Sequence, residues 1–289
     1  MLFRSDPFGR AVSYLRVSVT DRCDFRCVYC MSEDMAFLPK KDLLTLEELD
    51  RLCTIFIEKG VKKLRITGGE PTLRRDFLTT LRVAKSLGYR RIKVQTNGML
   101  FAYPEFAAKA AAAGMNEVNL LLKSLQPRVH DSLNRTPGSH ELLHAGLAQL
   151  RKLPVRLEGD VLLTTRNWTE LPELVAYYAG EGLRHFNLWL FSLVDQGDAD
   201  LARLVPKVSD MVPALLAARE AAKAAGATLT SLNTPACLLP RQAWDVLFDA
   251  PGMGMVVVNP GGQAFALEES SIERGVRVPA CARSAQRTA

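Results

Sequence analysis

The chain of 289 residues contains only six cysteines. It also lacks a large excess of either charge, since its net charge is only +6. So few cysteines exclude a fold built on disulfides, and the start from Met1 to Asp6 lacks the apolar core of a secretory signal. We therefore expect reduced thiols and a cytoplasmic protein. No apolar run is long enough to span a membrane, so we expect no membrane partner.

Basic residues are not concentrated in any one segment. Lys and Arg only modestly outnumber Asp and Glu, and they are spread along the chain. We expect no nucleic-acid partner, because a binding surface for nucleic acid needs a basic cluster, but an anionic small substrate is compatible with this balance. The hydrophobic content of 48% is sufficient for one large α/β domain, with or without a small appendage.

Strand-like and helix-like segments alternate along most of the chain. The pattern predicts strands at 14–20, 63–67, 91–96, 117–122, 155–163 and 185–190, and helices at about 45–59, 76–87, 104–113, 140–152 and 170–180. This alternation indicates parallel strands joined by right-handed crossovers, in either an open doubly wound sheet or a barrel. Composition does not choose between these two architectures.

The C-terminal part has a different pattern. A helix is expected at 208–225, and residues 255–267 are typical of a hairpin with the turn Asn259-Pro260-Gly261-Gly262. We therefore expect two domains, an α/β core at 1–200 and an extension with this helix and hairpin at 201–289.

Half of the cysteines, Cys23, Cys27 and Cys30, lie in one short loop directly after the first expected strand. Three thiolates on such a loop can hold a 4Fe-4S cluster by three of its irons, and no fourth cysteine follows as in a ferredoxin. The fourth iron keeps an open position, which is typical of a catalytic metal site. Zinc is the alternative, but it would need a fourth ligand, and the nearest downstream histidine is His130.

A second motif, Gly68-Gly69-Glu70-Pro71, follows the second expected strand. Two glycines let the backbone come close to a ligand, and Glu70 adds an acceptor that suits the ammonium group of an amino acid. Such a turn is common by itself, but downstream of this cysteine loop the combination is specific.

Together, these motifs resemble those of the radical S-adenosylmethionine (SAM) superfamily. Residues 20–31 are similar in sequence to its GTP 3′,8-cyclase family. The resemblance implies a partial (β/α)6 TIM-type barrel with a small hairpin-containing C-terminal extension. It implies one 4Fe-4S cluster, SAM, and a reducing partner such as flavodoxin or ferredoxin. In this chemistry an electron breaks a carbon–sulfur bond of SAM, and the 5′-deoxyadenosyl radical removes hydrogen from a small-molecule or peptide substrate. No catalytic side chain is expected beyond these cofactors.

The resemblance also assigns binding residues. For SAM it implies Tyr29, Gly68, Gly69 and Glu70. For the nucleotide of the cyclases the matching positions are Arg16, Arg65, Thr96 and Arg156, the last where that family has a lysine. An arginine near a strand end is also typical of a surface ion pair, so this alternative stays open for each arginine.

Three departures from the cyclase pattern argue against GTP. Leu121 replaces a serine that contacts SAM, and Lys123 replaces an aspartate, although Lys123 could pair with the SAM carboxylate instead. Ser192 and Val194 replace an acidic residue and a methionine of the SAM pocket.

The third departure concerns a second cluster, which the cyclases bind through three C-terminal cysteines before a Gly-Gly tail. Here Leu267 and Ser284 stand at two of these positions, and only Cys237 and Cys281 remain. Two thiolates cannot hold a cubane unaided, so we expect a degenerate auxiliary-cluster extension of the SPASM or twitch type. The sequence predicts a radical SAM enzyme with an unidentified substrate; the alternatives are a GTP 3′,8-cyclase and a non-catalytic iron–sulfur partner or regulatory protein.

Overall fold

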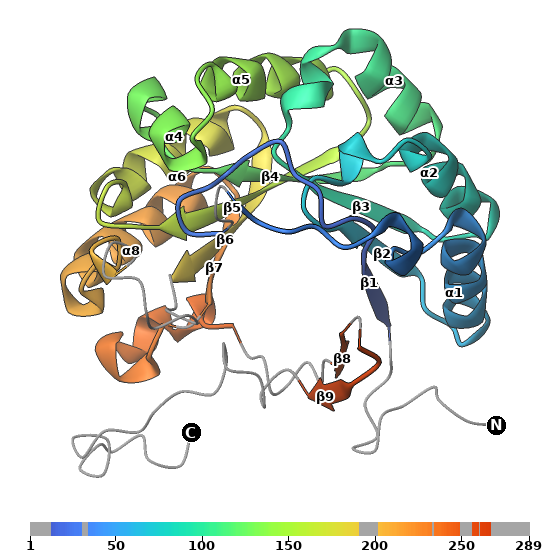
Figure 1. The fold of residues 1–289 in the computed structure, drawn as a ribbon. Helices are drawn as coiled ribbons and strands as arrows, with labels where there is room; N and C mark the ends of the chain where they lie inside the picture. Colours follow the sequence, from blue (N-terminus) through green and yellow to red (C-terminus); the bar gives the residue numbers. More distant parts are fainter. Residues whose placement is uncertain are drawn as a thin grey trace. The chain divides into compact units, whose positions relative to one another are not determined.

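A computed structural model describes residues 13–30, 34–190, 202–232, 234–248, 256–259 and 261–266 (Figure 1). The chain divides into two compact units, Met1–Asp160 with Glu181–Arg184 and Val161–Gly180 with His185–Ala289. The division passes through two strands. The predicted domain boundary between residues 200 and 201 lies outside the described residues.

Seven parallel strands form a single sheet, and their spatial order is β1-β2-β3-β4-β5-β6-β7. Their bounds are Tyr14–Ser18, Lys63–Thr67, Arg91–Thr96, Glu117–Leu122, Arg156–Leu163, Leu183–Leu190 and Thr228–Leu232. A spatial order that repeats the chain order is typical of a TIM-type barrel, whereas a doubly wound sheet reverses its order part-way. A closed TIM barrel has eight strands, and this sheet has seven. The prediction of an α/β fold with a partial barrel is therefore confirmed.

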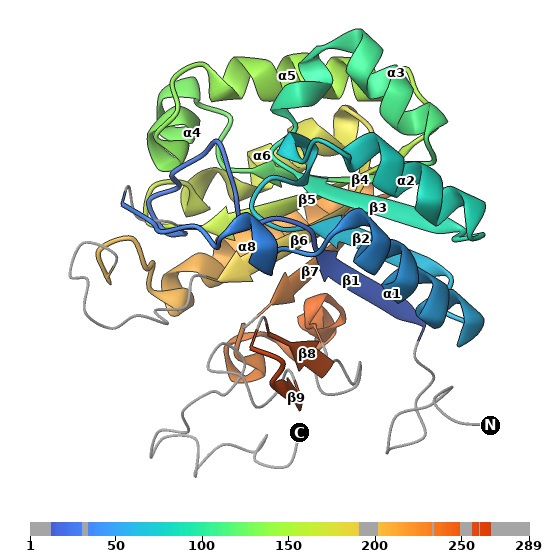
Figure 2. The same cartoon turned by 45° about the vertical axis from the view of Figure 1, so that its right-hand side comes forward.

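Helices of the first unit lie along one face of its strands. They are α1 (Leu46–Glu58), α2 (Phe77–Ser86), α3 (Pro104–Ala112), α4 (Pro127–Asn134) and α5 (Ser139–Leu150), with short 3-10 helices η1 (Lys40–Asp42), η2 (Pro71–Leu73) and η3 (Met99–Ala102). In Figures 1 and 2, α1, α2 and α3 follow one another beside β1 to β3. The predicted capping box opens α1, where Thr45 and Glu48 each accept a hydrogen bond from the other's backbone N–H.

Strands β1 to β4 separate an apolar face from a polar one. In β3, Ile92 and Val94 are buried, and Lys93 points to the opposite side because successive side chains of a strand alternate. The parallel register places Arg65 beside Lys93 and Lys93 beside Glu117. We call the side that carries Arg65, Lys93, Glu117 and the residues bonded to them the polar face.

The second unit contains α6 (Leu171–Gly180), α8 (Val208–Ala224), β7, and the short helices η4 (Trp168–Glu170), η5 (Ala236–Leu238) and η6 (Arg241–Val246). Strands β6 and β7 pair in parallel, with Phe186 beside Leu229. The expected hairpin is confirmed, since β8 (Val256–Val258) and β9 (Ala264–Ala266) are antiparallel. No helix among the described residues is long and apolar enough to cross a membrane.

Two elements, α4 and β7, were not predicted from the sequence. Helix α4 has only eight residues and most of its side chains are polar, and β7 has five residues with little apolar character. Segments so short have weak periodicity, and packing against neighbouring elements decides their structure.

Candidate functional site

The three cysteines lie on the loop 19–30, which leaves the C-terminal end of β1 and which we call the cysteine loop. Cys27 is buried, Cys23 is half-buried and Cys30 is exposed, and all three are free thiols. Within the loop, the backbone N–H of Cys30 donates to the carbonyl of Cys27 at 2.9 Å, and that of Phe25 donates to Cys23 Sγ at 3.4 Å. Three free thiols on one loop form the donor set of a cubane held by three irons.

No three Cys, His, Asp or Glu side chains in the described part of the chain are grouped so that they could hold one metal ion. A cubane does not require such a group, because each thiolate binds a different iron. The cysteine loop therefore fits a 4Fe-4S cluster better than it fits zinc.

The turn Gly68-Gly69-Glu70 holds the first part of the cysteine loop by backbone contact. Gly69 N–H donates to the carbonyl of Thr20, and Glu70 N–H donates to that of Arg22, both at 2.7 Å. A Cβ at Gly68 would lie 2.2 Å from the Thr20 oxygen, and Gly68 has φ +146°. The glycines make room for the cysteine loop, and their contact with a ligand stays a prediction.

Glu70 is buried, with 1% of its surface exposed, and its carboxylate joins two segments. Oε1 accepts from Thr72 N at 3.1 Å, from the Thr72 hydroxyl, and from the Thr96 hydroxyl at 2.8 Å, while Oε2 accepts from Asn97 N at 2.7 Å. Burial raises the pKa of Glu70, and these hydrogen bonds oppose the rise. Since Oε2 accepts only one of these bonds, it retains acceptor capacity that an ammonium group could use.

Thr96, a predicted nucleotide contact, has its hydroxyl engaged inside the protein. It is buried, it donates to Glu70, and it accepts from Gly98 N at 3.0 Å. Through its bond to Glu70, Thr96 helps to hold that carboxylate in place. A contact between Thr96 and a nucleotide stays a prediction.

The C-terminal end of α4 holds the other part of the cysteine loop. Arg26 N–H donates to the carbonyl of Asn134 at 3.2 Å, and Val28 N–H donates to that of Leu133 at 3.0 Å. The Cys27 thiol lies 3.4 Å from Asn134 Oδ1, to which it can donate. Sequence reasoning missed Asn134, because the helix that carries it was not predicted and Asn134 is remote from the cysteines in sequence.

Lys123 follows β4 directly and is 3% exposed. Its Nζ lies 5.7 Å from the ring centre of Tyr29, and burial of the Tyr29 hydroxyl, with Cys27 beside it, raises the tyrosine pKa. Desolvation within the loop raises the pKa of Cys23 to about 12 and also raises that of Cys30, where the charge of Lys123 opposes the rise. Cluster assembly would therefore release protons from these thiols.

The predicted contacts Arg16 and Arg65 lie on the polar face. Arg65 forms an ion pair with Asp160 at 3.2 Å, and Gln95 Nε2 donates to the same Asp160 oxygen at 3.1 Å. Arg16 Nη2 donates to Gln95 Oε1 at 3.4 Å. A hydrogen-bonded network thus joins β1, β2, β3 and β5 across this face.

A second network on the polar face includes Arg156. Its side chain pairs with Glu158 at 3.2 Å, and Glu158 also accepts from Lys93. Lys93 lies 3.7 Å from Glu117, which pairs with Arg91. Sequence reasoning missed the acidic residues of β5, although their alternation with apolar residues in 156–163 is a usable signal.

Asn119, on β4, has a buried side chain without a partner. It is 0% exposed, its register neighbour is Gln95, and neither Oδ1 nor Nδ2 bonds to any of the described residues. Buried amides are normally paired, so this one marks a position where a polar ligand can bind. Sequence reasoning did not single out Asn119, because pairing is visible only in the folded chain.

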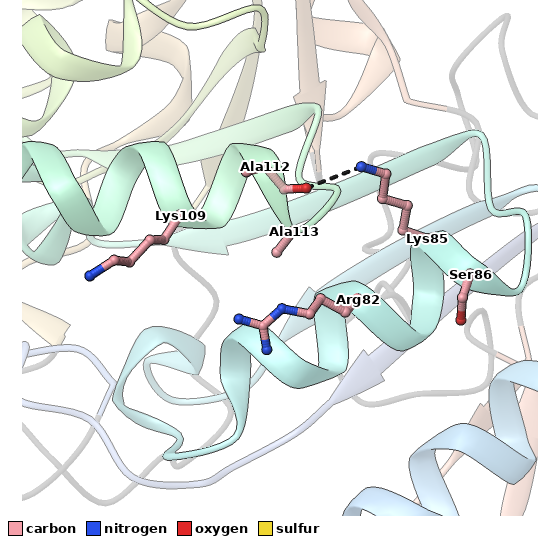
Figure 3. A pocket seen from close by; sticks show the side chains of 6 residues that line it. All are labelled: Arg82, Lys85, Ser86, Lys109, Ala112 and Ala113. Atoms are coloured by element: carbon pink, nitrogen blue, oxygen red, sulfur yellow. Dashed lines mark hydrogen bonds between the residues drawn. The ribbon is translucent and has the colours of Figure 1, made fainter.

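A cavity of about 600 Å³ lies away from the cysteine loop, at the C-terminal ends of α2 and α3 (Figure 3). Its lining consists of Arg82, Lys85, Ser86, Lys109, Ala112 and Ala113. Lys85 Nζ donates to the carbonyl of Ala112 at 3.1 Å. This contact compensates part of the negative partial charge at the C-terminal end of α3. None of these lining residues belongs to the cysteine loop or to the polar face.

Several predicted positions cannot be placed in this geometry. Ser192, Val194, Leu267, Cys281 and Ser284 lie outside the described residues. Cys237 lies in η5 and is exposed.

A family profile described as the Radical SAM superfamily matches residues 17–178, more than half of the chain. Among curated proteins, the GTP 3′,8-cyclase of Brucella abortus (strain S19) is 44% identical over 203 residues, which is 68% of this chain and 57% of that protein. The GTP 3′,8-cyclase of Brucella canis gives the same identity and coverage. The chain therefore spans a little over half the length of these relatives.

Solved structures share the fold. Streptococcus suis SuiB bound to precursor peptide SuiA matches with a TM-score of 0.60 and 16% identity, over 75% of this chain and 48% of that one. Native anSMEcpe with bound AdoMet and Cp18Cys peptide matches with a TM-score of 0.56 and 13% identity, over 76% of this chain and 62% of that one. At these identities the likeness concerns the fold alone.

Proposed function

This chain belongs to the radical SAM superfamily, and on that premise we propose that it binds one 4Fe-4S cluster through Cys23, Cys27 and Cys30 and cleaves SAM reductively. The proposal rests on the observation that backbone hydrogen bonds hold the cysteine loop at two places. The Gly68-Gly69-Glu70 turn holds residues 20–22, and the end of α4 holds residues 26–28. Three free thiols are thereby positioned on one loop.

When bound, the cluster and SAM supply the radical chemistry: one electron breaks a carbon–sulfur bond, and the 5′-deoxyadenosyl radical takes a hydrogen atom from the substrate, leaving methionine and 5′-deoxyadenosine. We propose that the electron comes from a reducing partner such as flavodoxin or ferredoxin. The residues of this chain bind and orient the reactants.

For SAM, the proposed contacts are Tyr29, the turn residues Gly68, Gly69 and Glu70, and Lys123. Glu70 Oε2 retains acceptor capacity for the ammonium group of the methionine part. Lys123 is a buried cation beside the loop, and its charge would attract a carboxylate of SAM.

For the substrate, we propose a small anionic molecule bound on the polar face. The cationic side chains there outnumber the acidic ones: Arg16, Arg65, Arg91, Lys93 and Arg156 against Glu117, Glu158 and Asp160. A surface of net positive charge attracts anions, and the amide of Asn119 can add a hydrogen bond. No catalytic side chain is required for the hydrogen abstraction.

GTP 3′,8-cyclisation is the second candidate, favoured by the 44% identity to cyclases over 203 residues. Arg16, Arg65, Thr96 and Arg156 are its nucleotide contacts. All four already bond within the protein, to Gln95, Asp160, Glu70 and Glu158. Binding GTP through them would require these bonds to be exchanged, and the chain has only two cysteines, Cys237 and Cys281, for a second cluster downstream of the core.

Anaerobic reconstitution tests the cluster assignment. We expect about four irons per chain, lost in a Cys23→Ala, Cys27→Ala, Cys30→Ala triple variant. Cys237→Ala is the matched control, because this cysteine is exposed and lies in η5, and it should retain all iron. About eight irons per chain, or four irons in the triple variant, would contradict the single-cluster proposal.

The reaction is tested with the reduced, reconstituted protein. We expect SAM to yield 5′-deoxyadenosine, detected by mass spectrometry, and GTP to remain unconverted. Absence of SAM cleavage from a fully loaded protein would favour a non-catalytic iron–sulfur partner. Formation of 3′,8-cyclised GTP, coupled to 5′-deoxyadenosine release, would establish the second candidate instead.

A further inference from the structure

Lys123 places a positive charge on one side of the cysteine loop. Its side chain is 3% exposed, and its Nζ lies 5.7 Å from the ring centre of Tyr29, the residue directly before Cys30. It lies between β4 and α4, and the last residues of α4 hold the loop at Arg26 and Val28. The ammonium group is therefore confined beside the Cys30 end of the loop.

The two arginines of the loop, Arg22 and Arg26, are more exposed than Lys123. Arg22 pairs with Asp21 at 3.2 Å, and Arg26, which donates to the carbonyls of Cys23 and Phe25 at 2.8 Å, is half-exposed. Water and counterions screen such charges far more than buried ones.

Two further titratable residues complete the surroundings. Glu70 is buried next to the Cys23 end of the loop, where its backbone N–H donates to the carbonyl of Arg22. His130 is buried on α4, and burial, followed by the charge of Lys123, lowers its pKa to about 3. His130 is thus neutral at ordinary pH and adds no positive charge to that of Lys123.

A 4Fe-4S cluster with three thiolate ligands has a net negative charge, which grows by one unit on reduction. A nearby positive charge stabilises the reduced form more than the oxidised form, and the effect is large where little water is present. Net charge and solvent exposure around a cluster are among the factors that set its reduction potential.

We propose that Lys123 raises the reduction potential of the cluster bound by Cys23, Cys27 and Cys30. The inference rests on the proposed function, because it requires a cluster on these thiols. It is distinct from any contact between Lys123 and SAM, since the charge acts on the cluster before SAM binds. Lys123 is in this sense a tuning residue that makes the cluster easier for its electron donor to reduce.

The test is an anaerobic redox titration of the reconstituted protein without SAM, followed by electron paramagnetic resonance of the reduced cluster. In Lys123→Met, which keeps the length of the side chain but removes its charge, the equilibrium constant for one-electron reduction should fall at least tenfold, a shift of 59 mV to more negative potential. Lys123→Arg should keep the wild-type potential. Lys109→Met is the matched control, because that lysine is 63% exposed on α3 and pairs with Glu105, and its loss should change nothing.

The outcomes separate this inference from the proposed function. A wild-type chain that loads no cluster would overturn both, whereas a loaded Lys123→Met with unchanged potential would overturn the tuning role alone. If Lys123→Met does not load, Lys123→Gln replaces it with the same expectation. Failure of both neutral variants to load would overturn the inference, because Lys123 would then be required for cluster binding and not for tuning its potential.

Discussion

Gly69 lies directly against the carbonyl group of Arg22: a Cβ at position 69 would stand 2.3 Å from the Arg22 oxygen. The next residue, Glu70, donates its N–H to the same oxygen at 2.7 Å. The two segments are distant in sequence, yet their backbones are in contact at the first cysteine of the loop. The glycine is required there because any side chain would separate the turn from the loop.

Gly69→Ala should therefore displace the cysteine loop. We expect a several-fold loss of iron after reconstitution and a stability loss of about 1 to 3 kcal/mol, which is typical of overpacking. Gly180→Ala is the matched control, since nothing lies within 4 Å of a Cβ at Gly180. Iron analysis and thermal unfolding measure both effects, and a Gly69→Ala protein with full iron would contradict the proposed fit.

Glu70→Ala should weaken SAM binding without removing iron, because Glu70 is a proposed SAM contact and not a cluster ligand. It should also lower stability by roughly 1 to 3 kcal/mol or more, since buried donors of Thr72, Thr96 and Asn97 lose their acceptor. SAM affinity is measured by calorimetry below the unfolding temperature. Glu105→Ala, exposed on α3, is the control. SAM affinity equal to wild type in Glu70→Ala would remove Glu70 from the SAM site.

Asn119→Leu should separate stability from function. Because the buried amide has no partner among the described residues, a leucine of similar size should leave stability unchanged or raise it by about 1 kcal/mol. If Asn119 binds the substrate, turnover of that substrate should fall while SAM cleavage without substrate persists. Denaturant unfolding and 5′-deoxyadenosine release measure the two properties. A clear stability loss would show instead that the amide is paired in the folded protein.

His130 should make the fold sensitive to acid. Burial, followed by the charges of Lys123 and His140, lowers the pKa of His130 from 6.5 to about 3. Below pH 6.5 the unfolded chain binds a proton at this residue and the folded chain does not, so stability should fall as pH drops from 6.5 towards 3. One such group contributes at most about 1.4 kcal/mol per pH unit.

His130→Gln removes this titration, so its stability should fall less steeply than that of the wild type between neutral pH and about pH 4.5. The slope should be reduced but not abolished, because burial also lowers the pKa of His144. Urea unfolding at several pH values measures the slopes. Equal slopes in the two proteins would contradict the assignment.

The cysteine loop and most strands could be predicted from the sequence because each is encoded in neighbouring residues. Strands β2, β3 and β4 have the predicted bounds, and the capping box at Thr45 begins α1 as expected. The choice between a barrel and a doubly wound sheet came from the family resemblance, because alternation of strands and helices is common to both. The strand order of the folded chain agrees with that choice.

What only the tertiary structure decided is which side chains meet at the site. Cys27 and Asn134 are 107 residues apart in sequence, and Arg65 and Asp160 are 95 apart. No local pattern encodes such pairs, because they depend on how strands and helices pack. The sequence determined that the thiols and the glycines follow the carboxyl ends of two strands. It also determined that arginines lie within the strands. Packing decided that the glycines lie against the cysteine loop, that Thr96 supports Glu70, and that a buried charge such as Asp160 has a partner. Burying a charge is favourable only where an opposite charge or a hydrogen bond compensates it.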